Sequence, residues 1–389
     1  MREEIEIGQE EVMKEKNSFQ YDKRDSQSTI VRPIESESFD YAAYQEYEAS
    51  LAERQKRFFE TDSGILVYRR VRADGVFYDK CRDMKESLSL QLGALQKSLE
   101  YQADIANFLE PWYGIGYIAG CFGGKYEFPA GQAPVVNPLF HSVEELLSTD
   151  PKPIAQTEMG KHILEMTEYF MDKTKGRVPV SMTDVQAPIN MLSYLMPITD
   201  LFIEVYDDPE GLADAAMMTA ELLAEFLEKQ RAIIGDALAS PGHGFASSRI
   251  LKGIGLSDDN SIMVSEDAYR ECFLPADEML GRKFGGLVFH SCGNWEQKIP
   301  MVKTMGGIIM ADGAFTAQTD PAPNTPDVFR RGFTDSGIIL NARAVGPDAY
   351  QTFERLYQKG MKLIAVTYCE TAKEQEKMYR RLHELELRQ

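Results

Sequence analysis

The stretch Leu287-Val-Phe-His-Ser-Cys-Gly293 joins a short apolar run to two residue types that often bind metal ions. Continuous apolar runs rich in β-branched residues indicate strands that are buried on both faces of a parallel sheet. Similar runs occur at residues 113–119, 178–182, 307–310, 338–340 and 363–366. Helix-start signals lie between the runs, such as Asp208-Pro209 and the pair Thr371 and Glu374. This alternation of strand and helix predicts a parallel α/β sheet.

Polar residues follow several of these runs, and their positions favour a closed barrel over an open sheet. They are Asp184, His290, Asp312, Asn341 and Cys369. In a (β/α)₈ TIM barrel the carboxyl ends of the strands surround one pocket, whereas in an open sheet they are spread along an edge. The chain has no Gly-x-Gly-x-x-Gly motif opening a helix and no phosphate-binding P-loop motif, which argues against the common nucleotide-binding sheets. We therefore predict a (β/α)₈ barrel.

The first part of the chain differs in composition from the rest. Residues 1 to 60 are charged and polar, and residues 49–59 have the pattern of an amphipathic helix. We predict a mainly helical N-terminal extension over residues 1–80, packed outside a barrel domain of residues 81–389. The alternative for the extension is a solvated or partly mobile arm, because charged composition disfavours an independent core.

Composition excludes several classes of function. The 389 residues carry a formal net charge of −19, so nucleic acid and anionic membrane surfaces are not expected partners. No apolar run is long enough to span a bilayer, and the N-terminus lacks the features of a signal peptide. Five irregularly spaced cysteines suit a reducing compartment. We therefore expect a cytoplasmic protein.

His290, Cys292 and Cys369 suggest a zinc site. Residues two apart in a strand point to the same side, so His290 and Cys292 can reach one metal ion, and Cys369 would approach from another strand end. Three protein ligands leave one position of tetrahedral Zn²⁺ open, as in catalytic sites. The alternative is that the histidine and cysteines are ordinary core residues, because cysteine is often buried as a small apolar side chain.

One imidazole and two thiolates give a zinc ion that is poorly suited to polarising water. Such a centre is suited to binding a further thiol and keeping it deprotonated and nucleophilic near neutral pH, which implies alkyl transfer to sulfur. Cytidine deaminases also use histidine and two cysteines. Their His-x-Glu and close Cys-x-x-Cys signature is absent from this chain.

The His-x-Cys-Gly strand end and the C-terminal cysteine resemble those of the zinc-dependent methylcobamide:thiol methyltransferases, of which the coenzyme M enzymes are typical, in the uroporphyrinogen decarboxylase superfamily. Other blocks follow the order of that superfamily: Met182-Thr-Asp-Val-Gln-Ala-Pro-Ile-Asn190, Tyr206-Asp-Asp-Pro-Glu210, Gly255-Leu-Ser-Asp-Asp259 and Val264-Ser-Glu-Asp-Ala-Tyr-Arg-Glu-Cys-Phe-Leu-Pro275.

The resemblance runs from about residue 110 to the C-terminus. It implies a (β/α)₈ barrel, Zn²⁺ on His290, Cys292 and Cys369, a small thiol, and a methylated corrinoid carried by a partner protein. The zinc-binding half of cobalamin-independent methionine synthase is similar in its ligands, so thiol alkylation is better supported than the identity of the methyl donor.

Other polar residues have weaker assignments. Asp184 and Gln186 follow a strand and are candidates to contact substrate, although an aspartate there can equally cap a helix. Asp258 and Asp259 are candidates to bind substrate, or they cap a turn. Asp312 and Asn341 are candidate partners for the ring nitrogen of His290 that does not bind metal. No role is assigned to three further histidines, His141, His162 and His243.

Two alternative functions remain open from the sequence. A decarboxylase acting on tetrapyrroles would need arginines for many carboxylates, and the superfamily's Arg-Gln-Ala-Gly-Arg loop is missing, with Arg69-Arg-Val-Arg72 the nearest basic cluster. A non-catalytic binding protein stabilised by zinc is the other. The identity of the thiol, the direction of transfer and the oligomeric state are not determined by the sequence.

Overall fold

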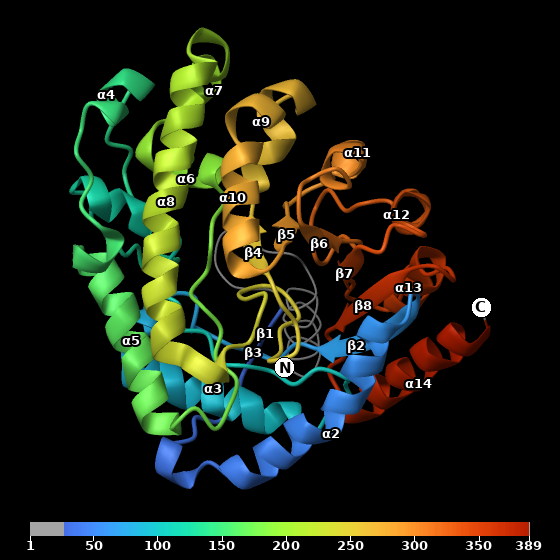
Figure 1. Cartoon of the computed structure of the whole chain (residues 1–389). Helices are drawn as coiled ribbons and strands as arrows, with labels where there is room; N and C mark the ends of the chain where they lie inside the picture. Colours follow the sequence, from blue (N-terminus) through green and yellow to red (C-terminus); the bar gives the residue numbers. More distant parts are fainter. Residues whose placement is uncertain (1–26, 389) are drawn as a thin grey trace, which may run out of the picture.

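A parallel sheet runs through the computed structural model, which describes residues 27–388 (Figure 1). Its six strands lie in the order β2-β8-β7-β6-β5-β4, and each neighbouring pair is parallel. The strands are β2 (Gly64–Arg69), β4 (Ile254–Ser257), β5 (Leu287–His290), β6 (Ile308–Ala314), β7 (Ile339–Arg343) and β8 (Lys362–Thr367). A separate pair is formed by β1 (Ser28–Thr29) and β3 (Arg72–Ala73).

Helices occupy most of the chain between the strands. The α-helices are α2 (Tyr41–Glu60), α3 (Met84–Ser98), α4 (Val143–Leu147), α5 (Glu158–Thr174), α6 (Pro188–Leu195), α7 (Ile198–Asp207), α8 (Pro209–Ile234), α9 (Glu266–Cys272), α10 (Leu274–Phe284), α11 (Ile299–Val302), α12 (Pro326–Phe333), α13 (Ala349–Leu356) and α14 (Ala372–Arg388). Short 3₁₀ turns are η1 (Ser36–Ser38), η2 (Asp79–Arg82), η3 (Tyr117–Phe122), η4 (Ile154–Gln156), η5 (Gly235–Ala237), η6 (Asp259–Met263) and η7 (Glu296–Lys298). Within residues 27–388 no helix is both long and apolar enough to cross a membrane.

Two predicted helix starts are confirmed by their hydrogen bonds. At the start of α8, the side chain of Asp208 accepts the backbone N–H of Gly211 at 3.0 Å, and Pro209 occupies the first turn. Before α14, Thr371 and Glu374 form the reciprocal pair of a capping box, with distances of 3.1 and 3.2 Å. These caps satisfy backbone N–H groups that have no partner within the helix.

Each face of the sheet packs against a different core, because successive strand side chains point to opposite faces. The inner core contains Leu66, Tyr68, Val288, Met310, Ile339, Ile364 and Val366. The intervening residues pack into the larger outer core, which includes Ile65, Val67, Leu287, Phe289, Leu340, Leu363 and Ala365 together with many helix residues. The continuous apolar runs in the sequence therefore reflect strands buried on both sides.

The prediction of a parallel α/β sheet is confirmed, with β5 to β8 where the apolar runs indicated. Between β2 and β4 the chain forms single parallel bridges instead of long strands: Leu109 with Val180, Val180 with Leu238, and Gln186 with Ser257. The six strands do not themselves close a ring, so the (β/α)₈ barrel stays a prediction.

The expected strand at residues 113–119 is wrong. Gly114 has a positive φ of 82°, and η3 begins at Tyr117. A strand requires negative φ throughout, so this Gly-rich segment turns instead of extending.

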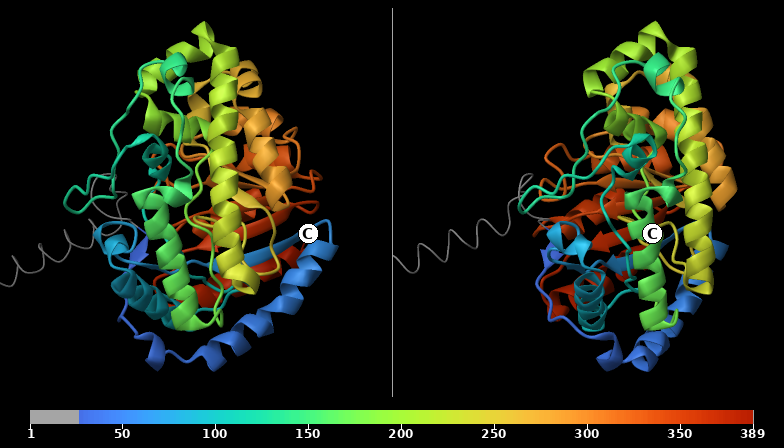
Figure 2. Two further views of the ribbon diagram at one scale, coloured as in Figure 1. Left: turned by 60° about the vertical axis from the view of Figure 1, so that its left-hand side comes forward. Right: turned by 90° about the vertical axis from the view of Figure 1, so that its left-hand side faces the viewer.

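The sheet begins earlier in the chain than the sequence suggested. β2 lies within residues 1–80 and pairs with β8, so the structure places the start of the sheet at Gly64 and leaves α2 as the helix that precedes it. Figure 2 shows α2 running along the edge of the molecule below the sheet. The part of the predicted extension before residue 27 lies outside the described residues.

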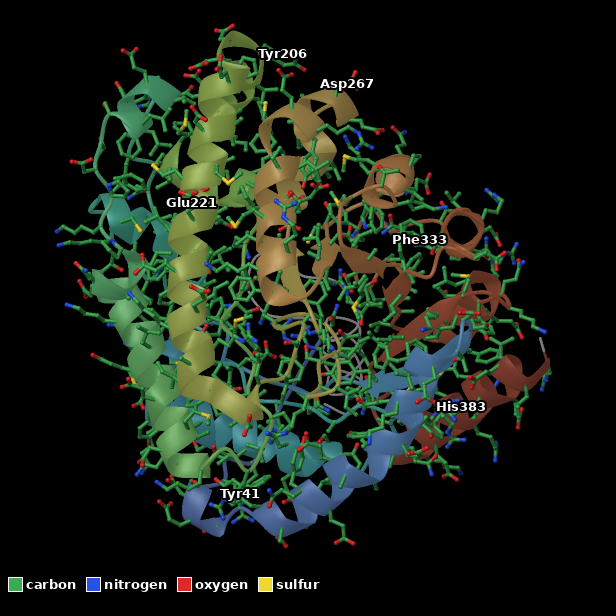
Figure 3. All side chains as sticks on the ribbon, in the orientation of Figure 1. Tyr41, Tyr206, Glu221, Asp267, Phe333 and His383 are labelled. Carbon is green, nitrogen blue, oxygen red and sulfur yellow. The ribbon has the colours of Figure 1, made fainter. Side chains whose placement is uncertain are left out.

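Ion pairs with the buried carboxylate of Asp104 link α2 and α14 to the chain beside β2. Asp104 accepts the backbone N–H of Val67 at 2.8 Å and pairs with Arg54 of α2 at 3.1 Å. His383 of α14, labelled in Figure 3, approaches the same carboxylate at 3.1 Å. The first and last long helices are thus held at one side of the sheet.

Candidate functional site

A histidine, a cysteine and a carboxylate meet where β4 and β5 end. His290 is the last residue of β5, Cys292 follows two residues later, and Asp259 is the first residue of η6 after β4. His290 Nε2 lies 3.6 Å from Cys292 Sγ and 3.5 Å from Asp259 Oδ1. All three donor atoms lie within 4.8 Å of one another, and residues 27–388 contain no second group of three such donors this close.

Backbone hydrogen bonds fix the loop that carries Cys292. Asp259 Oδ1 accepts the Cys292 N–H at 2.8 Å, and Asp320 Oδ2 accepts the Gly293 N–H at 2.7 Å. Gly293 has a φ of 76°, a conformation that favours glycine and turns the chain away from the strand. The Gly that follows the His-x-Cys pair thus lets the loop hold the thiol beside the imidazole.

The neighbouring strands orient the imidazole of His290. His290 pairs in register with Asp312 of β6, which pairs with Asn341 of β7. Asp312 Oδ2 lies 2.6 Å from His290 Nδ1 and 3.1 Å from Arg343 Nε, and Asn341 Nδ2 donates to Asp312 Oδ1. An acceptor on Nδ1 leaves Nε2 turned toward Cys292 and Asp259, as in histidines that bind metal.

The charged side chains of Asp312, Arg343 and His290 also shift the pKa values of Asp312 and His290. Burial alone would raise the pKa of Asp312, but Arg343 and His290 outweigh burial and hold that pKa below its usual value. Burial alone would lower the pKa of His290, but its hydrogen bonds to Asp312 and Cys292 hold that pKa well above its usual value. Asp312 is therefore an ionised acceptor at neutral pH.

Cys369, the third zinc ligand expected from the sequence, is not part of this group. On β8, Ile364 and Val366 belong to the inner core and Tyr368 packs against it. Cys369 lies two residues beyond the end of β8, and its thiol is not among the donor atoms that meet within 4.8 Å. Burial raises the pKa of the Cys369 thiol to about 11, and the nearby charges that influence it are those of Arg69 and Glu374.

Asp184 and Gln186 are linked to the donor group through hydrogen bonds between buried side chains. Gln186 Nε2 donates to Asp184 Oδ1 at 2.9 Å, and its Oε1 accepts from Asn190 Nδ2 at 3.0 Å. The same amide of Asn190 reaches Asp259 Oδ2 at 3.4 Å. This chain of contacts helps to position the Asp259 carboxylate.

Asp258 has a different environment from its neighbour Asp259. Its side chain is 1% exposed, and the Tyr269 hydroxyl lies within hydrogen-bonding distance of both Asp258 and Asp277. Burial, and next the charge of Asp277, raise the pKa of Asp258 well above its usual value. The Tyr269 hydroxyl has one proton and can donate to only one of the two carboxylates. An additional proton must therefore be shared among Asp258, Asp277 and Tyr269.

His243, to which the sequence assigned no role, lies in a second buried polar cluster beside Asp184. Its Nδ1 contacts Glu110 Oε2 and its Nε2 lies 3.3 Å from Asp184 Oδ2, while Arg70 approaches Glu110 at 3.5 Å. Trp112 Nε1 donates to Asp184 at 3.1 Å. The sequence signal for His243 is weak, because the three acidic and basic partners come from segments far apart in the chain.

Glu110→Gln is expected to reduce stability most at neutral pH and less in acid. Burial raises the pKa of Glu110, but His243 and Arg70 outweigh burial and lower it to about 2. A carboxyl whose pKa is lowered by folding stabilises the protein above its unfolded pKa of about 4.3, and the contribution, on the order of 3 kcal/mol, is lost as the pH falls toward 2. Urea unfolding of both proteins between pH 7 and pH 3 should show the difference in unfolding free energy narrowing below pH 4.5. A difference that stays constant over this range would contradict the assigned ionisation of Glu110.

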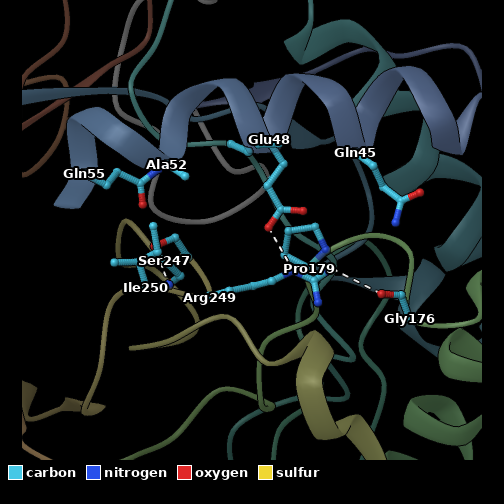
Figure 4. A pocket seen from close by; sticks show the side chains of 12 residues that line it. Gln45, Glu48, Ala52, Gln55, Gly176, Pro179, Ser247, Arg249 and Ile250 are labelled. Atoms are coloured by element: carbon cyan, nitrogen blue, oxygen red, sulfur yellow. Dashed lines mark hydrogen bonds and ion pairs between the residues drawn. The ribbon is translucent and has the colours of Figure 1, made fainter.

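A cavity of about 340 Å³ lies beside α2 (Figure 4). Its lining residues include Gln45, Glu48 and Gln55 of α2 together with Gly176, Pro179 and residues 247–250. Arg249 crosses it, pairing with Glu48 at 2.9 Å and donating to the Gly176 carbonyl at 3.2 Å. None of the lining residues belongs to the donor group of His290, Cys292 and Asp259.

Comparison with known proteins gives a partial match. A protein-family model described as Uroporphyrinogen decarboxylase (URO-D) matches residues 63–241, a stretch shorter than half of the chain. The matched stretch begins at β2 and includes Glu110, Asp184 and Gln186, but it ends before Asp259, His290 and Cys292. No curated protein matches the chain.

Solved structures with the same fold are known. A methyltransferase from Methanosarcina mazei superposes with a TM-score of 0.57 and 12% sequence identity, covering 80% of this chain and 88% of that chain. At this identity the similarity establishes a shared fold over most of both chains. The chain therefore resembles the URO-D family in its first half and shares the fold of a methyltransferase over most of its length.

Proposed function

We propose that this protein is a zinc-dependent methyltransferase that moves a methyl group between a methylated corrinoid, carried by a partner protein, and a small thiol. The observation that carries the proposal is the group of His290, Cys292 and Asp259 at the carboxyl ends of neighbouring parallel strands. In barrels built from such strands, this edge is where chemistry takes place. The closed (β/α)₈ barrel and the cytoplasmic location are parts of the same proposal, and five cysteines without a disulfide agree with a reducing compartment.

The donor atoms fit a zinc ion. Imidazole nitrogen, thiolate sulfur and carboxylate oxygen are the three ligand types that Zn²⁺ takes in proteins. His290 and Cys292 would hold it. A zinc ion bound there would bind the thiol substrate, lower its pKa from about 8.5 and keep its sulfur nucleophilic.

The protein's own residues prepare this position. Asp312 fixes the imidazole so that Nε2 is presented, and the ring of Phe245 packs edge-on against His290 with centroids 6.0 Å apart. Cys292 is exposed while His290 is mostly buried, with 14% of its side chain accessible. The accessible side of the group is therefore the thiol and carboxylate side, and we expect substrates to approach from there.

The comparisons support the choice of reaction. The structural relative from Methanosarcina mazei is titled a methyltransferase and shares the fold. The His-x-Cys-Gly strand end and Cys369 resemble the methylcobamide:thiol branch, the motifs at residues 182–190 and 255–275 follow the order of the wider superfamily, and the family match to residues 63–241 agrees with that superfamily. Together with a donor group suited to thiol activation, these similarities favour methyl transfer.

The family description favours decarboxylation of a tetrapyrrole as the second candidate. Such a substrate carries many carboxylates and requires available arginines. Arg69 donates to the Cys369 carbonyl at 2.9 Å and stacks on the Tyr101 ring at 4.7 Å, and Arg70 pairs with the buried Glu110. Because internal partners already engage these arginines, methyl transfer is the better supported function.

The proposal is tested with the zinc-loaded protein, methylcobalamin and a panel of small thiols. We expect loss of the methyl–cobalt bond, followed by absorption, and formation of the methyl thioether, followed by mass spectrometry, with one thiol strongly preferred. Both signals should require zinc and disappear after chelation. Folded, zinc-loaded protein that transfers no methyl to any thiol, or that instead releases CO₂ from a uroporphyrinogen, would contradict the proposal.

A further inference from the structure

We infer that Asp259, and not Cys369, is the third protein ligand of the metal ion. This inference rests on the proposed function only in assuming that the site holds a metal. It assigns the ligand set as His290 Nε2, Cys292 Sγ and an oxygen of Asp259, with a fourth position open to substrate.

The spacing of the donor atoms matches a tetrahedral zinc ion. With zinc bonds of about 2.0–2.3 Å, tetrahedral geometry separates nitrogen from sulfur by about 3.6 Å and nitrogen from oxygen by about 3.4 Å. The observed distances from His290 Nε2 are 3.6 Å to Cys292 Sγ and 3.5 Å to Asp259 Oδ1. Both distances from His290 Nε2 thus have the values of a coordination site, and the remaining pair of donor atoms lies within 4.8 Å.

The surroundings of Asp259 hold its carboxylate in place. The Cys292 N–H donates to Oδ1 at 2.8 Å, and Asn190 Nδ2 lies 3.4 Å from Oδ2. Asn190 is in turn bonded to Gln186, and Asn190 Oδ1 accepts the backbone N–H of Asn260 at 3.1 Å. Hydrogen bonds of this kind orient ligating carboxylates in metal sites.

The charges of the ligand set also balance. A thiolate and a carboxylate neutralise a divalent ion, and a metal at Nε2 would displace the His290 proton, which leaves a neutral imidazole whose other nitrogen is bonded to Asp312. Two anionic ligands are therefore present without Cys369, whose thiol lies outside the donor group and near the charges of Arg69 and Glu374. A site with one thiolate and one carboxylate differs from a two-thiolate site in the number of sulfur atoms bound to the metal.

This difference is measured with Co²⁺ in place of zinc, because each thiolate bound to cobalt adds a charge-transfer band in the near ultraviolet. For the full-length protein we expect the intensity of one thiolate, lost in Cys292→Ser and unchanged in Cys369→Ser. Competition against a chromophoric chelator should show Asp259→Asn weakening zinc binding by at least about 10-fold, the lower range for loss of a supporting group. Asp320→Asn is the matched control, because Asp320 likewise accepts a backbone N–H of this loop without being part of the donor group.

The outcomes distinguish failure of this inference from failure of the proposed function. If Cys369→Ser halves the cobalt band and Asp259→Asn leaves zinc affinity unchanged, Cys369 is the ligand and our assignment is overturned, while the methyltransferase proposal stands. If the folded wild-type protein binds neither metal, both proposals fail. If Asp259→Asn and Asp320→Asn weaken binding equally, loop order explains the effect and the assignment of Asp259 is likewise overturned.

Discussion

Cys292→Ser is expected to lower zinc affinity by more than about 100-fold, because even the loss of a residue that only supports a metal ligand costs about 10-fold to 100-fold. The serine hydroxyl remains protonated at neutral pH and its oxygen is a weaker zinc ligand than a thiolate. His290 and Asp259 alone would not retain the ion. Methyl transfer, which in our account needs the metal, should fall with it, and both quantities are measured on the same preparation by elemental analysis and the methylcobalamin assay.

The control for this variant is Cys272→Ala, which removes a buried thiol from α9. It changes core packing by one sulfur atom and should leave zinc content and methyl transfer at the wild-type level. If Cys292→Ser stays folded and keeps its zinc, the thiol of Cys292 is not a ligand and the site described above does not exist in this form.

Asp312→Asn is expected to reduce both stability and zinc affinity. The Asp312 side chain is 2% exposed and supports His290 Nδ1, Asn341 and Arg343 at once. In this variant Arg343 would lose its counter-ion. Removing one charge of a buried pair typically lowers the free energy of unfolding by about 3–5 kcal/mol. An asparagine also orients the imidazole less firmly, so zinc affinity should fall by about 10-fold to 100-fold.

Urea unfolding of the metal-free proteins separates the stability effect from the loss of metal. Asp327→Asn is a matched control, because Asp327 also pairs with arginines, Arg330 and Arg355, but on the surface of α12. That substitution should leave the unfolding free energy nearly unchanged, as is usual for exposed pairs. Equal free energies of unfolding for Asp312→Asn and the wild type would show that the contacts of Asp312 with His290 and Arg343 do not stabilise the protein.

The sequence predicted the parts of the fold whose pattern is local. The apolar runs near residues 287, 308, 339 and 363 are β5 to β8, and the caps of α8 and α14 form as expected. Strand β2 has the apolar pattern of the other strands but lies within residues 1–80, which the charged composition marked as an extension, and the run of β4 is interrupted by Gly255. The segment 113–119 has an apolar pattern but contains a glycine with positive φ, a conformation that the pattern does not reveal.

The site was predicted in part for the same reason. His290 and Cys292 are close in sequence, so their proximity followed from strand geometry, and Asp312 lies in the adjacent strand in register. Cys369 could not be placed, because residues 363–366 are apolar on both faces and their sequence does not show which residues point inward. Asp259 and His243 depend on contacts between segments far apart in the chain, which no local pattern encodes.

Zinc-edge X-ray absorption of the zinc-loaded protein, recorded before and after addition of the preferred thiol, tests whether this site binds and activates a thiol. We expect one sulfur and two or three nitrogen or oxygen ligands at about 2.0–2.3 Å before addition, and one additional sulfur afterwards. This result would show a metal site that binds the thiol itself. A zinc spectrum that does not change with any thiol, in a protein that is folded and fully loaded, would contradict a thiol-activating methyltransferase.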